Sequence, residues 1–185
     1  MSKAPTKAPA KKATAAKAPA TAASKAAPAK TSDAKNAGNT LILDTTKGEV
    51  VIEMLPDLAP GHVAHIKKLV GEKFYDGIVF HRVIDGFMAQ TGCPSGTGTG
   101  GSSYPDLKAE FNAEPHLRGI CSMARSSSPN SANSQFFICF GDARFLDKQY
   151  TVWGRVTKGM EIVDQIKRGE PVRNPDSITT ARMKL

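Results

Sequence analysis

From residue 40 onward, short apolar runs separated by turn signals dominate the chain. The first two runs, 41–43 and 50–52, flank a turn that ends at Gly48, and together they predict a β-hairpin over 40–55. The later runs are equally short and rich in β-branched and aromatic residues, so they predict strands as well. We expect these strands at 120–124, 134–140, 151–156 and 177–183.

Two amphipathic helices are expected among these strands. The first begins at Pro60, a residue suited to the first helical turn, and its apolar residues recur at helical spacing as far as Gly71. The second is expected over 160–167. Because helices and strands do not alternate along the chain, a parallel sheet is disfavoured. The pattern favours a closed antiparallel barrel covered by two helices, with an open α+β sandwich as the alternative.

A second hairpin, over 79–92, carries the chemistry on which the functional hypothesis is built. Its turn falls at Asp85-Gly86, where the glycine readily adopts a positive φ. The first run contains Arg82, and the second places Met88 and Gln90 two residues apart, so that both side chains share one face of the strand. A guanidinium, an apolar group and an amide are thus brought together, which suits gripping an uncharged peptide better than hydrolysing one.

Composition divides the chain at residue 39. Residues 1–39 contain fifteen Ala, eight Lys, four Pro and one acidic residue, a net charge of +7, whereas 40–185 contain 17 basic and 16 acidic residues, a net charge of +1. The first segment has too little apolar surface to offset its chain entropy, so we predict a disordered tail at 1–39 and one folded domain at 40–185. Its Lys-Ala-Pro units resemble basic tails that bind nucleic acid non-specifically, and a solubilising spacer is the alternative.

Other features of the sequence disfavour several classes of protein. No apolar run is long enough for a secretory signal or a bilayer span, so no membrane association is expected. Three cysteines without CxxC spacing favour free thiols in a reducing cytoplasm. Cys139 is expected in a buried strand and Cys93 nearer the surface, without neighbours that would activate it. His62 and His65 lack the spacing of a zinc-protease helix, so we expect a solvated helix face and no metal site.

Two further patterns lack the context that their chemistry requires. The glycine-rich stretch 96–101 satisfies G-x-G-x-x-G but does not open a helix, so we predict a surface loop without a bound dinucleotide or other cofactor. The serines of the polar loop 125–133 lack a G-x-S-x-G elbow and a paired histidine with an orienting acid. Nucleophilic catalysis is therefore disfavoured.

Four motifs occur in order along the folded part of the chain. They are Phe80-His81-Arg82-Val83-Ile84-x-Gly86-Phe87-Met88-x-Gln90-x-Gly92, Gly98-Thr99-Gly100-Gly101, Ser122-Met123-Ala124 and Asn133-Ser134-Gln135-Phe136-Phe137-Ile138. Together they resemble the signatures of cyclophilins, which are peptidyl-prolyl cis–trans isomerases that assist protein folding. The resemblance covers nearly all of 40–185. It implies an eight-stranded antiparallel β-barrel capped by two α-helices, a monomer that binds proline-containing polypeptides, and no cofactor.

The resemblance also implies roles for single residues. Arg82 corresponds to the family's catalytic arginine, Gln90 to a residue that hydrogen-bonds the substrate backbone, and Gln135 to one that helps position Arg82. Phe145 and Tyr150 stand where Trp and His are usual in eukaryotic members, a departure that resembles bacterial cyclophilins and implies weak binding of cyclosporin. The remaining residues implied to line the proline pocket and its groove are Phe87, Met88, Ala124, Arg125, Phe137 and Leu146.

These residue types suit the isomerisation of a prolyl bond. Rotation about a peptide bond has a barrier of ~18–20 kcal/mol and breaks no covalent bond, so neither a nucleophile nor a metal is required. When the amide twists, the proline nitrogen regains a lone pair, and a donor aimed at it stabilises the twisted state more than either planar state. A guanidinium presents such donors in a rigid fork, and apolar walls lower the dielectric around them. Arg82 is therefore predicted to donate a hydrogen bond to the twisted amide.

Three alternatives remain open. Taken singly, Arg82 fits a surface ion pair, and Phe87, Met88 and Phe137 fit an ordinary core. The same groove also fits a non-catalytic module or chaperone that binds proline-containing peptides. In the third alternative the basic tail is primary, and the chain is a nucleic-acid-associated protein that carries an isomerase domain.

Overall fold

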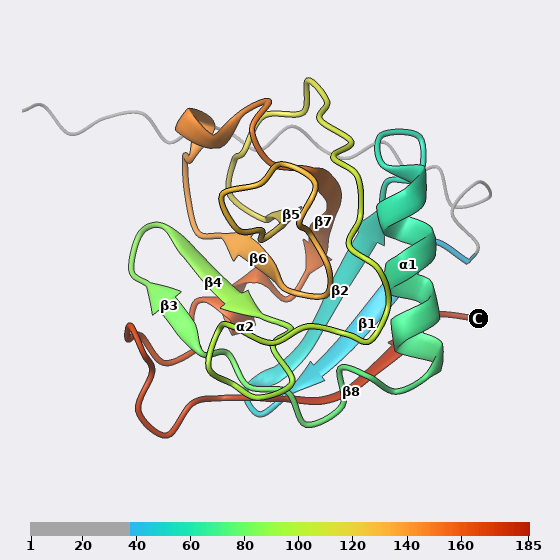
Figure 1. Ribbon diagram of the computed structural model, residues 1–185. Helices are drawn as coiled ribbons and strands as arrows, with labels where there is room; N and C mark the ends of the chain where they lie inside the picture. The colour runs from blue at the N-terminus through green and yellow to red at the C-terminus, as the bar shows by residue number, and fades with distance from the viewer. Residues whose placement is uncertain (1–37) are drawn as a thin grey trace, which may run out of the picture. The chain divides into compact units, whose positions relative to one another are not determined.

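The computed structural model describes residues 38–185, so the predicted disordered tail and its polyanion binding fall almost wholly outside the described residues. Eight strands form one antiparallel sheet in the order β3-β4-β6-β5-β7-β2-β1-β8 (Figure 1). The strands are β1 (Thr40–Thr45), β2 (Gly48–Met54), β3 (Arg82–Ile84), β4 (Met88–Thr91), β5 (Ile120–Met123), β6 (Phe136–Cys139), β7 (Val152–Lys158) and β8 (Ile178–Met183).

Both predicted hairpins are confirmed. In the first, β1 and β2 pair as far as Thr45 opposite Gly48, and the backbone N–H of Gly48 donates to the Thr45 hydroxyl at 3.2 Å inside the turn. In the second, β3 and β4 pair with Arg82 opposite Gln90. The cross-strand register thus sets these two side chains next to each other.

The sheet curls into an open half-barrel. β3 and β8 stand at the two ends of the strand order, and only isolated bridges, Val79 with Ser177 and Val83 with Gly169, join the segments beside them. The predicted mainly β, eight-stranded antiparallel architecture is confirmed. The predicted closed barrel is not found, because no continuous strand pairing joins β3 to β8. The segment before β8 contains Pro171 and Pro175, which cannot donate backbone hydrogen bonds, so it forms no ladder with β3.

Helix α1 (Pro60–Gly71) begins and ends where the sequence predicts. The carboxylate of Glu110 accepts the backbone N–H groups of Gly61 and His62, each at 2.9 Å. These groups have no partner within the helix, and a negative charge there also interacts favourably with the helix dipole. A residue from a distant loop therefore caps the helix.

The expectation that His62 lies on a solvated helix face is wrong. His62 is fully buried, and its Nδ1 lies 2.5 Å from Oε2 of Glu110, whereas His65 is half-buried. The physical reason is positional: His62 precedes the buried Ile66 by four residues, and residues four apart share one face of a helix.

Helix α2 (Met160–Val163) ends earlier than the predicted 160–167. After it, the backbone N–H groups of Gln165 and Ile166 bond to carbonyls three residues back, and that of Lys167 donates to the Asp176 carboxylate at 2.9 Å. These bonds replace the next helical turn. Helix α1 lies beside β8, as Figure 1 shows, and α2 packs against β2. Neither helix of this part of the chain has the length and apolar character needed to cross a bilayer.

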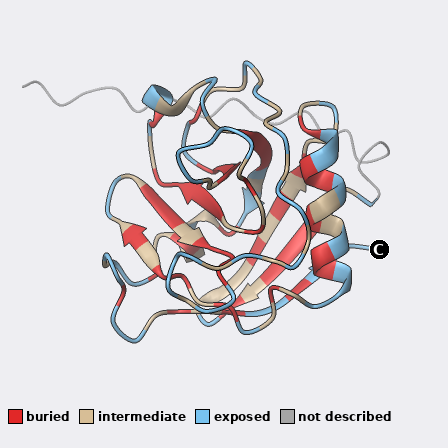
Figure 2. Ribbon diagram, in the orientation of Figure 1, coloured by how far each residue is buried: buried red, intermediate tan, exposed pale blue. Residues whose placement is uncertain are grey.

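The two faces of β6 serve different apolar clusters. Phe136 and Ile138 belong to the main core, where Phe136 makes edge-to-face contacts with Trp153 and Tyr75 at centroid distances of 5.3 and 5.6 Å. Phe137 belongs to a smaller cluster with Met88 on the other face. Figure 2 shows buried positions along β6 and along its neighbour β4. The alternation of a strand thus separates the structural core from the floor of the site described next.

Candidate active site

A cavity of about 460 Å³ opens over β3, β4 and β6. Gln135 lines a second cavity of about 570 Å³, which shares Gln90, Gly98, Ala124 and Arg125 with the first. Phe145 is 66% exposed and packs against the lining residue Phe87, with ring centroids 5.4 Å apart. The other nine residues singled out from the sequence all line the first cavity: Arg82, Phe87, Met88, Gln90, Ala124, Arg125, Phe137, Leu146 and Tyr150.

The floor of this cavity is apolar and ordered. Met88 and Phe137 are almost fully buried, at 1% and 5% exposure. Tyr150 meets the Phe137 ring edge-to-face at 5.9 Å, and Leu146 packs against the same cluster. An uncharged, compact group is the kind of ligand that such a floor accommodates, because burying a charge against it would carry a large desolvation penalty.

Arg82 stands at the edge of this floor with one nitrogen engaged. Its Nε donates to Oε1 of Glu170 at 2.7 Å, and the two side chains are 39% and 57% exposed. No further hydrogen bond or ion pair joins the Arg82 side chain to residues 38–185. The surface ion pair that the sequence left open for Arg82 therefore exists, but it uses only Nε. Neither terminal nitrogen has a partner among these residues, and Arg82 lines the cavity.

Gln90 and Gln135 form an amide pair between the two cavities. Nε2 of Gln90 donates to Oε1 of Gln135 at 2.9 Å. Nε2 of Gln135 in turn donates to the backbone carbonyls of Gly98 and Gly100, at 2.9 and 2.8 Å. Gln135 thus holds Gln90 and the glycine-rich loop, and the role beside Arg82 implied for it stays a prediction.

Arg125 is fixed against the opposite wall. Its guanidinium lies over the ring of Tyr150, 4.6 Å from the centroid, and Nη2 and Nε donate to the carbonyl of Gln149 at 2.7 and 3.1 Å. A planar guanidinium stacks well on an aromatic ring, and carbonyl contacts hold it in place. The tyrosine that replaces the usual histidine therefore supports this arginine.

Sequence reasoning assigned no role to several residues that line the first cavity. His81 is one of them: burial, and then the charge of Arg82, lower the pKa of its ring, so the imidazole is neutral near neutral pH. Its place beside Arg82 in the first motif was an available signal. Glu170 and Pro171 are others, and they come from a segment far along the chain with no motif of its own.

The expectation that Cys93 lies near the surface, without neighbours that would activate it, is also wrong. The thiol is buried, at 1% exposure, and its Sγ accepts the backbone N–H groups of Gly98 and Gly100 at 3.2 and 3.3 Å. Burial alone raises the pKa of a thiol, but hydrogen bonds from Ser95 and from these N–H groups outweigh it and lower the pKa of Cys93 to about 6. By contrast, burial raises the pKa of Cys139, which lies in β6 as predicted, to about 12.

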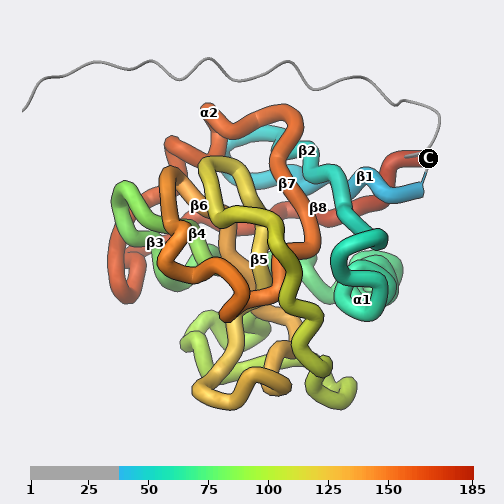
Figure 3. The backbone as a smooth tube through the Cα atoms, turned by 90° about the horizontal axis from the view of Figure 1, so that it is seen from above, coloured from blue at the N-terminus to red at the C-terminus, as the bar shows by residue number. Residues whose placement is uncertain are grey.

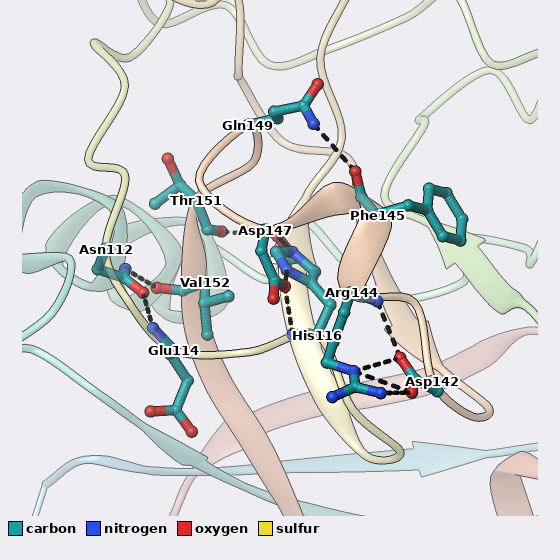
Figure 4. Close-up of polar contacts among 11 residues, drawn as sticks. Asn112, Glu114, His116, Asp142, Arg144, Phe145, Asp147, Gln149, Thr151 and Val152 are labelled. Carbon is teal, nitrogen blue, oxygen red and sulfur yellow. Dashed lines mark hydrogen bonds and ion pairs between the residues drawn. The ribbon is translucent and has the colours of Figure 1, made fainter.

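A row of three polar residues lies behind the cavity wall. Nε2 of His116 is 3.0 Å from Oγ of Ser122. Nδ1 of His116 is 2.9 Å from Oδ1 of Asp147 (Figure 4). The order is that of a nucleophile, a base and an orienting acid. Ser122 and His116 are fully buried, however, and the Ser122 hydroxyl donates to the carbonyl of Thr151 at 3.0 Å. The row therefore supports the wall, where the His116 ring stacks on Phe137 at 6.3 Å.

Nothing in the part of the chain that the structure describes is arranged to hold a metal ion, since no three His, Cys, Asp or Glu side chains cluster for it. The site is instead an apolar floor with two arginines, Arg82 and Arg125, and the amide pair of Gln90 and Gln135 around it. It can grip a peptide and present hydrogen-bond donors to it.

Comparison with known proteins agrees with this geometry. The family model described as cyclophilin type peptidyl-prolyl cis-trans isomerase/CLD matches residues 40–184. A probable peptidyl-prolyl cis-trans isomerase of Brucella suis is 53% identical over 167 residues, which cover 82% of this chain and 85% of the relative. Peptidyl-prolyl cis-trans isomerase B of Bacillus subtilis is 43% identical over 138 residues, which cover 74% of this chain and 94% of that relative.

Solved structures give the same answer. A cyclophilin from Hirschia baltica superposes with a TM-score of 0.74 at 33% identity, covering 79% of this chain and 74% of that one. A Cryptosporidium parvum cyclophilin-type isomerase, solved in the presence of the dipeptide Ala-Pro, has a TM-score of 0.74 at 26% identity and covers 79% and 99% of the two chains. Family model, relatives and fold coincide over the same residues, and the chain belongs to the cyclophilin-type peptidyl-prolyl cis-trans isomerases.

Proposed function

We propose that the first cavity binds a proline of an extended polypeptide and that Arg82 accelerates rotation about the peptide bond that precedes it. The observation that carries the proposal is the pairing state of Arg82 at the cavity. Its two terminal nitrogens have no hydrogen-bond partner among residues 38–185, and Arg82 lines the same cavity as Met88 and Phe137, which form its apolar floor. The related enzyme solved with Ala-Pro supports a proline dipeptide as the unit that is recognised.

In the proposed mechanism the floor holds the proline ring while the preceding carbonyl turns. As the amide leaves planarity, its nitrogen becomes a hydrogen-bond acceptor, and a terminal N–H of Arg82 donates to it. The bond forms only in the twisted state, so it lowers the barrier without stabilising either planar isomer. Gln90, fixed by Gln135, donates to or accepts from the substrate backbone and keeps the chain in register.

The test is the isomerisation rate of an Xaa-Pro peptide, coupled to a protease that cleaves only the trans isomer. Arg82→Ala removes the donor and is expected to cost about 2–4 kcal/mol of transition-state stabilisation, roughly a 30- to 900-fold loss in kcat/KM. The matched control is Arg182→Ala on β8, whose ion pairs with Asp44 and Glu49 lie outside the cavity, and this variant should keep the wild-type rate. An Arg82→Ala enzyme with undiminished rate would contradict the mechanism.

The same assay separates catalysis from binding alone. If the wild-type chain binds the peptide but leaves its isomerisation at the spontaneous rate, the chain is a proline-peptide binding module and not a catalyst. The departures at Phe145 and Tyr150 further support weak cyclosporin binding, which a titration of the folded enzyme measures.

A second proposal concerns residues 1–39. Eight lysines against one acidic residue support non-specific binding of nucleic acid or another polyanion, through release of counterions. The full chain should then bind DNA or RNA with an affinity that falls steeply as salt rises, and a chain without 1–39 should lose this binding. Equal binding by both chains would assign it to the folded domain instead.

A further inference from the structure

Glu170 binds one nitrogen of Arg82 and leaves the other two without a partner among residues 38–185. The bond from Nε to Oε1 is 2.7 Å long, and Glu170 lines the same cavity as Arg82. Glu170 stands 88 positions further along the chain. The pair is therefore part of the site, and one of its members comes from the segment between α2 and β8.

The backbone holds this segment in place on both sides of Arg82. Segment 169–172 passes beside β3, as both views of the chain show (Figures 1 and 3). Its first and last residues bond to the two neighbours of Arg82, so the residues between them are fixed opposite Arg82. The bonds are Gly169 N–H to Val83 O at 2.8 Å, Val83 N–H to Gly169 O at 2.9 Å, and Val172 N–H to His81 O at 3.1 Å.

Two local features reinforce this placement. A Cβ on Gly169 would lie 2.8 Å from the carbonyl oxygen of Pro171 and from Cα of Val172, so the chain can turn this tightly only with glycine there. Just before it, Arg168 donates through Nε to Oδ1 of Asp85 at 3.0 Å, and its guanidinium lies over the Phe140 ring, 4.3 Å from the centroid. The backbone that carries Glu170 is thus anchored to the hairpin that carries Arg82.

We propose that Glu170 is a positioning residue for Arg82 in the isomerisation. This inference rests on the proposed function and names a residue that acts in it. A guanidinium is planar, so a charge-assisted bond at Nε fixes the orientation of the whole group. The two terminal nitrogens are then held towards the cavity before substrate arrives, and the transition state does not have to order a long flexible side chain.

The exposure of the pair separates this role from a structural one. Ion pairs between partly exposed side chains contribute little to folding stability, because water and salt screen them. Removing the carboxylate should therefore leave the free energy of unfolding unchanged and lower the rate of isomerisation. Because the bond acts on the twisted state, the loss should fall on kcat and leave KM nearly unchanged.

The experiment compares Glu170→Ala and Glu170→Gln with the wild-type enzyme in the full chain. Glu170→Ala should lower kcat about tenfold, which corresponds to ~1.4 kcal/mol, with KM changed by less than about twofold. Glu170→Gln keeps an acceptor oxygen and should recover most of the loss. The matched control is Glu53→Ala, since Glu53 accepts Nε of Arg155 at 2.9 Å between β2 and β7, outside the cavity. It should keep the wild-type kcat.

A double variant shows whether Glu170 acts through Arg82. In an Arg82→Ala background, Glu170→Ala should have no further effect on kcat. A wild-type kcat in Glu170→Ala, or an equal loss with and without Arg82, would overturn the inference while the proposed function stands. If Arg82→Ala itself keeps the wild-type rate, the proposed function fails, and the inference fails with it.

Discussion

Two polar groupings lie near the cavity whose floor includes Phe137, and they differ in what they can reach. Behind the ring, Ser122, His116 and Asp147 form a buried row in which the serine hydroxyl already donates to a backbone carbonyl. In front of it, Arg82 lies partly exposed at a cavity with a single nitrogen engaged. The first has the residue types of a hydrolase, and the second has those of an ordinary surface ion pair.

The comparison teaches that access and the demands of the reaction, more than residue type, decide which grouping acts. Hydrolysis needs a nucleophile that reaches a carbonyl, and the buried hydroxyl of Ser122 does not. In the proposed mechanism, twisting an amide needs only a donor beside an apolar floor, and Arg82, which lines the cavity, has two nitrogens without a partner among residues 38–185.

The largest effect is expected at the wall that the two groupings share. Phe137 is 5% exposed, stacks on His116 and forms part of the cavity floor. Phe137→Ala should lower the free energy of unfolding by about 3–5 kcal/mol, because it removes a buried ring and leaves a cavity. It should also weaken peptide binding. Chemical denaturation and a peptide titration measure the two effects.

Phe137→Leu serves as the control for this change. It keeps an apolar floor of reduced volume, so both losses should be smaller than in the alanine variant. Peptide affinity that stays at the wild-type value in Phe137→Ala would count against the assignment of the floor.

A smaller effect is expected when the buried row alone is changed. Ser122→Ala removes a hydroxyl that donates to Thr151 O and meets Nε2 of His116. It should cost about 1–3 kcal/mol of unfolding free energy, because buried polar groups lose partners. The isomerisation rate of the folded variant should not change. A large loss of rate would give the row a catalytic part that burial argues against.

The smallest effect is a pH dependence of stability that comes from Asp147. The backbone N–H of His116 donates to the Asp147 carboxylate at 2.8 Å. This bond, together with the imidazole of His116, outweighs the opposing effect of burial and holds the pKa of Asp147 below its usual range. The unfolded chain therefore takes up this proton first. The stabilisation is present above the ordinary carboxyl pKa of about 4 and is lost as the pH falls through the lower folded value.

Asp147→Asn tests this dependence. Its unfolding free energy, measured by denaturation from pH 6 down to pH 2.5, should decline less steeply than that of the wild-type chain at the acidic end. Identical slopes for the two chains would show that the contact with His116 does not contribute.

Local patterns predicted the parts of the fold that depend on neighbours in sequence. The hairpins at 40–55 and 79–92 and the start of α1 follow from alternation, turn glycines and Pro60. The missed features depend on distant partners. The end of α2 is set by a bond from Lys167 to Asp176, and the open edge of the sheet by a proline-containing segment that meets β3 in isolated bridges only.

The site divides in the same way. The proximity of Arg82, Met88 and Gln90 could be predicted from the sequence of one hairpin, because strand alternation and register bring these side chains to the same cavity. The resemblance to a family supplied Leu146 and Tyr150, which come from later segments. Glu170 carried no local signal, because its position depends on backbone bonds to β3. The burial of His62 could have been predicted from the sequence, because His62 lies four residues before the apolar Ile66 and therefore on the same face of the helix.

The most direct measurement follows cis–trans exchange of an Ala-Pro peptide on the enzyme by NMR exchange spectroscopy. It reports the rate of rotation in the bound state, separate from affinity. The proposed mechanism predicts that Arg82→Ala still binds the peptide and folds normally, while exchange on the enzyme slows roughly 30-fold or more. Exchange at the wild-type rate in bound Arg82→Ala enzyme would contradict the claim that this arginine eases the twist of the prolyl amide.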